Sequence, residues 1–111
     1  MKIDIYWDEK YQSTKFALLE DVNINGYVVP AGFVSDGCSC PKVLWNYCEP
    51  ISGKYIAAFL LHDWMYSTQA VTRKNADVML RENLITAGMS TAKAYTIYAA
   101  VRTFGGSHWN K

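Results

Sequence analysis

Short runs of hydrophobic residues, separated by turn-forming residues, make up the first third of the chain. In residues 2–7 the odd positions hold isoleucine or tryptophan, and the even positions hold lysine, aspartate or tyrosine. This alternation has the period of a β-strand. Further strand-like runs at 15–20, 27–29 and 33–35 are separated by asparagine, glycine and proline. The pattern predicts a small antiparallel β-sheet over residues 2–35.

Hydrophobic residues at helical spacing follow in the rest of the chain. A central helix over 54–67 is apolar on all sides, which places it in the middle of a core. Two more helices are predicted over 73–87 and 91–104, with Thr72 and Ser90 as their N-caps.

A short helix over 42–47, begun by Pro41, is expected to join the strands to these helices. The predicted fold class is therefore α+β, with a small N-terminal antiparallel β-sheet followed by a short helix and three packed α-helices. With 111 residues and no linker-like stretch, we expect a single domain over residues 1–111. Its sheet covers 2–35 and its helical part 41–105.

Composition narrows the classes of function. The formal net charge is +1 and no basic cluster is present, so a nucleic-acid partner is not expected. Acidic residues near the start argue against a signal peptide, and no apolar stretch reaches the roughly 20 residues of a transmembrane segment. Three cysteines, an odd number, are more typical of a reducing compartment than of a disulfide framework. We expect a folded protein that is made in the cytoplasm.

The central helix ends in the sequence His-Asp-x-x-Tyr, formed by His62, Asp63 and Tyr66. His62 and Tyr66 can share a helix face, whereas adjacent His62 and Asp63 point about 100° apart and need different partners. The helix over 73–87 should fold back antiparallel on the central helix, which can bring Asp77 level with His62. A histidine held by a carboxylate is the usual general base, because it exchanges a proton near neutral pH.

A structural interpretation of the same residues stays open. His62 could be a core histidine that is bonded to a backbone carbonyl. Asp77 could then pair with Arg73 or Arg81, each four residues away on its own helix.

The turn between the strands and the helices is a second candidate site. It covers residues 35–40 and contains Asp36 and Ser39. Such a loop offers a carboxylate and backbone carbonyls to calcium, and Asp63 could complete the metal site. Ser39 is a candidate nucleophile activated by His62, although no Gly-x-Ser-x-Gly elbow surrounds it. Plain turn chemistry is the alternative, in which Asp36 bonds nearby backbone and Ser39 caps the next helix.

Cys38, Cys40, Cys48 and His62 match a tetrahedral zinc site in number. The single residue between the first two is shorter than the usual ligand spacing, so we do not expect zinc. We interpret the cysteines as small buried apolar residues. The cofactor stays undetermined, with calcium as the candidate.

Five blocks of sequence carry a resemblance to a known family. The blocks are residues 29–37, Ser39 with Pro41, residues 60–66, Arg73 with Ala76 and Asp77, and residues 99–105. Together they resemble the phage and prophage proteins grouped as domain of unknown function 1353, over residues 27–106. Cys38 and Cys40 depart from the family pattern, which has small or aliphatic residues there. The resemblance implies no settled activity.

The arrangement of His62, Asp63, Tyr66 and Asp77 after a glycine-containing loop is also similar, as a motif, to the site of secreted phospholipase A2. That resemblance implies that His62 is the base that activates water and that Asp63 is a calcium ligand. It also implies that Asp77 and Tyr66 orient the histidine. The chain departs from phospholipase A2 in its loop, in lacking that family's disulfides, and in the sheet that precedes the helices.

We therefore expect a small phage-encoded hydrolase that acts on an ester or amide of the host envelope, in lipid or peptidoglycan, with a His62–Asp77 base. The alternative is a non-enzymatic phage protein in which the motif is structural, either a virion or tail component or an inhibitor that binds a host factor. The expected partner is a host-envelope component or a host or virion protein. The protein is expected in the host cytoplasm when it is made. Whether it also associates with the virion stays open.

Overall fold

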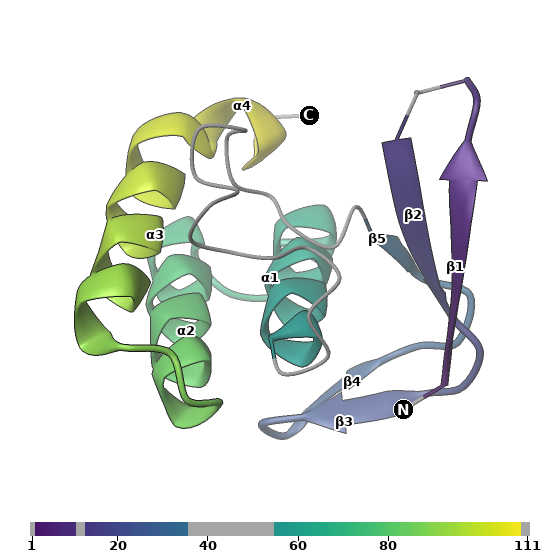
Figure 1. Ribbon diagram of the computed structural model, residues 1–111, viewed down its shortest axis with the longest axis horizontal. Helices are drawn as coiled ribbons and strands as arrows, with labels where there is room; N and C mark the ends of the chain where they lie inside the picture. Colours follow the sequence, from purple (N-terminus) through teal and green to yellow (C-terminus); the bar gives the residue numbers. More distant parts are fainter. Residues whose placement is uncertain (1, 11–12, 36–54, 110–111) are drawn as a thin grey trace.

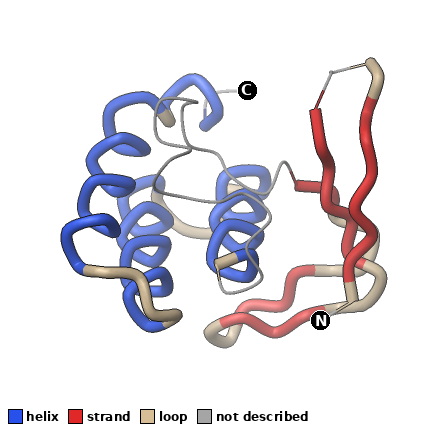
Figure 2. The backbone as a smooth tube through the Cα atoms, in the orientation of Figure 1, coloured by secondary structure: helices blue, strands red, loops and turns tan. Residues whose placement is uncertain are grey.

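The computed structural model of the chain describes residues 2–10, 13–35 and 55–109. Strands come first along the chain and helices follow, so the predicted α+β class is confirmed. Figure 2 shows the strands on one side of the molecule and the helices on the other. The short helix predicted over 42–47 lies outside the described residues.

In the described part of the chain, five strands form two antiparallel sheets. The strands are β1 (Ile3–Asp8), β2 (Ser13–Leu18), β3 (Val22–Ile24), β4 (Tyr27–Val29) and β5 (Val34–Ser35). The first sheet has the order β1-β2-β5, and the second consists of β3 and β4 (Figure 1).

The division into two sheets differs from the single sheet that the sequence predicts. Val22–Ile24 pairs with Tyr27–Val29 as a local hairpin, and only Asn25 and Gly26 connect the two strands. Both connecting residues have positive φ, +53° and +85°, as a two-residue hairpin turn with the twist of its strands requires. Part of the segment that the sequence assigns to a turn is therefore strand, and this hairpin pairs with itself instead of extending the first sheet.

Within residues 55–109, the structure has four helices. They are α1 (Ile56–Thr68), α2 (Arg73–Thr86), α3 (Thr91–Phe104) and α4 (Gly106–Trp109). The predicted N-caps are confirmed, because Thr72 and Ser90 each accept a hydrogen bond from the backbone N–H three residues on. The sequence does not predict α4.

Helix α1 lies between the strands and the pair formed by α2 and α3 (Figure 1). One side of α1, with Phe59, packs into a cluster with Leu80, Leu84 and Ile97. Its other side, with Leu60, packs with strand residues in a second cluster. This position explains why α1 is apolar on all sides, and each fully buried large side chain contributes about 1.5–3 kcal/mol to folding.

Candidate functional site

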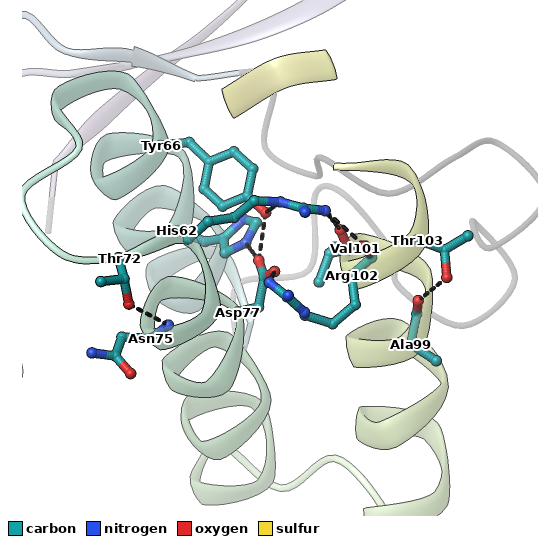
Figure 3. Close-up of polar contacts among 10 residues, drawn as sticks. His62, Tyr66, Thr72, Asn75, Asp77, Ala99, Val101, Arg102 and Thr103 are labelled. Atoms are coloured by element: carbon teal, nitrogen blue, oxygen red, sulfur yellow. Dashed lines mark hydrogen bonds and ion pairs between the residues drawn. The ribbon is translucent and has the colours of Figure 1, made fainter. Parts of the chain in front are cut away.

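The side chains of His62 and Asp77 meet between α1 and α2. Nε2 of His62 lies 2.7 Å from Oδ1 of Asp77, and the two side chains are 1% and 0% exposed. His62 lies near the middle of α1. Asp77 lies in the second turn of α2, which follows a short connection and has Thr72 as its N-cap. The predicted approach of these two residues is confirmed (Figure 3).

Tyr66 lies one turn after His62 and contacts the same carboxylate oxygen. Its hydroxyl donates a hydrogen bond of 2.6 Å to Oδ1 of Asp77. The rings of His62 and Tyr66 are 4.4 Å apart between centroids, and the ring of Trp109 meets Tyr66 edge-on at 5.3 Å. The predicted grouping of Tyr66 with His62 and Asp77 is thus present, and α4 supplies Trp109 beside it.

Two arginines complete the polar network. Nη1 of Arg102, from α3, donates to Oδ2 of Asp77 at 3.0 Å. Arg73 donates from Nε to the Tyr66 hydroxyl at 3.3 Å, and from Nη2 to the backbone carbonyls of Val101 and Arg102 at 2.8 and 2.7 Å. Through these contacts Asp77 and Arg73 join α1, α2 and α3. Figure 3 shows Asp77 between His62 and Tyr66 of α1 and Arg102 of α3.

The ion pair of Asp77 differs from both alternatives that the sequence offers. Arg81 contacts Glu82, and Arg73 contacts the Tyr66 hydroxyl, so the cation that meets Asp77 is Arg102. Helical spacing within α2 could not indicate this contact, because Arg102 lies on a different helix. The signal was present only in the resemblance, whose blocks include Arg73 and residues 99–105 without assigning either a role.

Gly105 ends α3 directly against the Tyr66 hydroxyl. A Cβ atom at this position would lie 2.7 Å from the hydroxyl oxygen of Tyr66, which is too close for an ordinary contact. Glycine therefore lets the end of α3 approach the network. The residue is buried, and its N–H bonds the carbonyl of Val101 at 2.9 Å.

The network fixes the charge of its carboxylate. Burial alone would raise the pKa of Asp77, but hydrogen bonds from His62, Tyr66 and Arg102 outweigh it and hold that pKa below its ordinary value of 3.8. Burial and the hydrogen bond to Asp77 raise the pKa of Tyr66. At neutral pH, Asp77 is therefore an anion. The Tyr66 hydroxyl keeps its proton and donates a hydrogen bond to Asp77.

The charge of Asp77 also assigns the tautomer of His62. Nε2 faces a carboxylate whose oxygen can only accept, so Nε2 carries a hydrogen, and Nδ1 is the nitrogen that holds the lone pair in the neutral form of the ring. Nδ1 is buried and has no hydrogen-bond partner among the residues that the structure describes. A buried acceptor without a partner is uncommon in folded proteins.

Asp63 points to a different partner, as its position beside His62 requires. The hydroxyl of Ser35, at the end of β5, donates to Oδ2 of Asp63. This bond places the start of the 35–40 turn against α1, as the order of elements suggests. Asp36 and Ser39 lie outside the described residues, and so do Cys38, Cys40 and Cys48.

The candidate metal site is not assembled by the described residues. Within residues 2–10, 13–35 and 55–109, no group of three or more His, Cys, Asp or Glu side chains is placed to hold a metal ion. Calcium takes six to eight oxygen ligands, and of the predicted ligands only Asp63 is described. The described residues alone therefore do not make up a calcium site. No helix in the described part of the chain is long and apolar enough to cross a membrane.

Comparison with known proteins identifies the family. A family model described as "Protein of unknown function (DUF1353)" matches residues 13–101. The chain belongs to the DUF1353 family. The DUF1353 match includes His62, Tyr66, Arg73 and Asp77, and it ends one residue before Arg102. No curated protein and no solved structure matches the chain.

Proposed function

We propose that this DUF1353 protein is a hydrolase in which Nδ1 of His62 is the general base. One observation carries the proposal. Nε2 of His62 is held by Asp77, while Nδ1 is buried and has no hydrogen-bond partner in the described part of the chain. A ring fixed in one tautomer, with its second nitrogen available for a proton, is the arrangement that general-base catalysis requires.

The proposed reaction is hydrolysis of an ester or amide. Nδ1 of His62 removes a proton from a water molecule, and the water oxygen attacks the carbonyl carbon of the substrate. The tetrahedral intermediate then breaks down. Its alcohol or amine leaves with the proton that Nδ1 took from the water. During the step in which His62 is an imidazolium, the anionic Asp77 stabilises the positive charge and holds the ring in place.

The other residues have supporting roles in this proposal. Tyr66 and Arg102 occupy the remaining positions around Asp77 and prevent its carboxylate from turning away from His62. Asp63 and Asp36 are the proposed metal-ligating residues. Ser39 stays the candidate nucleophile that His62 could activate in place of water. No step of the reaction above is routed through a metal ion.

The proposed substrate is an ester or amide of a bacterial envelope, in lipid or peptidoglycan. Support for this class comes from the resemblance of the sequence blocks to phage and prophage proteins, which act at or inside a bacterial host. It also comes from the motif shared with phospholipase A2, whose histidine hydrolyses an ester.

A second candidate is a non-enzymatic phage protein, such as a virion or tail component or an inhibitor of a host factor. The burial of the His62 ring favours this candidate, because a side chain that is 1% exposed does not open to solvent. The contacts of Asp77 and Arg73 with three helices favour it as well. In this case the same residues stabilise the fold and bind no substrate.

The test is product detection by mass spectrometry after incubation of the purified protein with phospholipid vesicles or with peptidoglycan, each with and without calcium. The informative variant is His62→Gln, because the glutamine amide can donate to Asp77 near the position of Nε2 but cannot accept a proton as a base. Asn75→Ala, an exposed position on α2, is the matched control. Thermal unfolding of each variant is measured in parallel.

We expect the parent protein to release product from one substrate and His62→Gln to lower the rate by about 10²–10⁴-fold. Asn75→Ala should keep the parent rate. Failure of the parent to release product from either substrate would reject the hydrolase, as would full turnover by His62→Gln. If the parent releases no product and His62→Ala is strongly destabilised, the non-enzymatic candidate is supported.

A further inference from the structure

Strand β1 forms a free edge of the β1-β2-β5 sheet. Among the described residues it pairs with β2 alone, and Figure 1 shows it on the side of β2 away from β5. Natural sheets usually protect such an edge with proline, lysine, a bulge or a short strand. The six residues Ile3–Asp8 are IDIYWD, with no proline and no lysine, and they pair with β2 without a bulge.

The hydrogen bonds of the sheet show which backbone groups of β1 face outward. Leu19 N donates to Lys2 O at 2.9 Å, so these opposite residues form a hydrogen-bonded pair. Such pairs alternate along an antiparallel ladder, so Asp4 and Tyr6 also direct their backbone groups toward β2. The residues between them direct their N–H and C=O groups away from the sheet; they are Ile3, Ile5 and Trp7.

The other side of β2 supports this assignment independently. Leu18 N donates to Phe33 O at 2.9 Å, so Leu18 faces β5. Its neighbour Ala17, which is opposite Asp4, must then face β1. Both ladders therefore give the same direction for every residue of the sheet.

A second copy of β1 fits this edge as an antiparallel strand. When a two-fold axis passes through Ile5, each Ile5 lies opposite the Ile5 of the second copy, and each Ile3 lies opposite Trp7. The outward N–H and C=O groups of all three residues then find partners. The result is one continuous sheet across two chains, joined at β1.

Charges select this register. With the axis at Ile5, Lys2 lies opposite Asp8 of the second copy, twice by symmetry, and Asp4 lies opposite the hydroxyl-bearing Tyr6. Moving the axis to Asp4 would place the two Asp4 side chains opposite each other. Moving it to Tyr6 would place Asp4 opposite Asp8. Like charges directly opposite each other destabilise a strand pair, so of these three registers the one centred on Ile5 is favourable. Centring the axis on Ile3 or on Trp7 would pair fewer residues, because the outward groups of the other of these two residues would lie beyond the end of the partner's β1.

The exposure of Trp7 also indicates that the outer edge of β1 is the interface. Trp7 is 56% exposed in the single chain, an unusual position for the largest apolar side chain. Across the two-fold axis it would pack on the β-branched Ile3 of the second copy, a favourable type of cross-strand pair.

We propose that two copies of this chain associate by antiparallel pairing of their β1 strands about a two-fold axis at Ile5. The association is independent of the proposed hydrolase activity, since β1 contributes no residue to the His62 network. Its occupant is a second copy because both the backbone groups and the charges of the edge complement themselves.

The test begins with sedimentation velocity of the untagged protein over a range of concentrations. We expect the mass to rise from 12.6 kDa, the mass of one chain, toward twice that value. Lys2→Glu and Asp8→Lys should each shift the equilibrium toward the monomer, because each places like charges opposite each other at both symmetric positions. The double variant Lys2→Glu/Asp8→Lys exchanges the two charges and should restore the dimer.

A matched control is Lys93→Glu, which makes the same charge change at an exposed position on α3 and should leave the dimer unchanged. Circular dichroism of every variant checks that the fold is kept. Amide hydrogen exchange gives the location of the interface. In the dimer, the N–H groups of Ile3, Ile5 and Trp7 should exchange slowly, and in Lys2→Glu they should exchange fast while those of Asp4 and Tyr6 stay protected.

Three results would overturn the proposal. The first is a protein that stays monomeric at every concentration. The second is a dimer in which the three outward amides still exchange fast, which would place the interface elsewhere. The third is a double variant that stays monomeric although each single variant is folded, which would contradict the register.

Discussion

The helical part of the molecule and its β1-β2-β5 sheet differ in whether their polar groups have hydrogen-bond partners. Between the helices, the Asp77 carboxylate is 0% exposed and accepts hydrogen bonds from His62, Tyr66 and Arg102. At the edge of the sheet, backbone donors and acceptors of β1 face away from the only strand with which it pairs in the described part of the chain.

This difference separates two kinds of substitution. A change inside the network leaves other buried polar groups without partners, so it acts on folding. A change along β1 acts on groups that water can reach in the single chain, so it acts on association instead. Substitutions in the network should therefore lower the free energy of unfolding more than substitutions along β1.

Asp77→Ala should have the largest effect on stability. The variant leaves the buried donors of His62 and Tyr66 without their acceptor and the partly exposed Arg102 without its ion-pair partner. We expect the free energy of unfolding to fall by about 3–5 kcal/mol. Tyr66→Phe removes one donor to Asp77 and the acceptor of Arg73 Nε, and it should cost about 1–3 kcal/mol. Urea denaturation measures both, with Asn75→Ala as the control. A loss below about 1 kcal/mol for Asp77→Ala would show that the network does not stabilise the helices.

Acid should weaken the helical part through the same carboxylate. Because the pKa of Asp77 in the folded chain lies below its ordinary value of 3.8, the stability that it provides is fully present above that value. This stability is lost as the pH falls below 3.8 and through the lower pKa of the folded state.

The measurement compares the urea midpoints of the parent and Asp77→Asn between about pH 5 and about pH 2. Other carboxylates titrate in both proteins, so the difference between the two curves isolates Asp77. We expect the parent to lose more stability than the variant over this range. Parallel curves would contradict a lowered pKa for Asp77.

Trp7→Ala should have the smallest effect on the single chain. We expect the free energy of unfolding to change by less than about 0.5 kcal/mol, since the side chain is more than half exposed. Phe16→Ala, on the neighbouring strand and fully buried, should cost about 3–5 kcal/mol. Both are measured in the Lys2→Glu background to exclude any contribution from dimerisation. A cost above about 1 kcal/mol for Trp7→Ala would place this tryptophan in the monomer core.

Sequence reasoning predicts most of the helical part because local rules determine it. Periodicity and the capping residues Thr72 and Ser90 define α2 and α3 closely, and Gly88, with φ of +111°, follows the end of α2. The short connection after α1 forces α2 to fold back. The approach of His62 and Asp77 then follows from their positions on the two helices.

The contacts that the sequence does not predict depend on packing in three dimensions. Arg102 reaches Asp77 from a third helix, and no spacing rule fixes the rotation of α3 against α2. The separate β3–β4 hairpin depends on which strands find each other, and hydrophobic alternation is the same for either pairing. Helix α4 is too short for a periodic signal and is held by contacts such as the one between Trp109 and Tyr66.

Gly105 gives the network a consequence for the way DUF1353 sequences can diverge. An added Cβ would lie 2.5 Å from the backbone carbonyl oxygen of Val101 and 2.7 Å from the Tyr66 hydroxyl, so two helices restrict this position. Loss of the hydroxyl at position 66 alone would not make room for alanine, because the carbonyl of Val101 would still be too close. A relative that carries a larger residue at position 105 should therefore end α3 with a different backbone path and hold its tyrosine in another way.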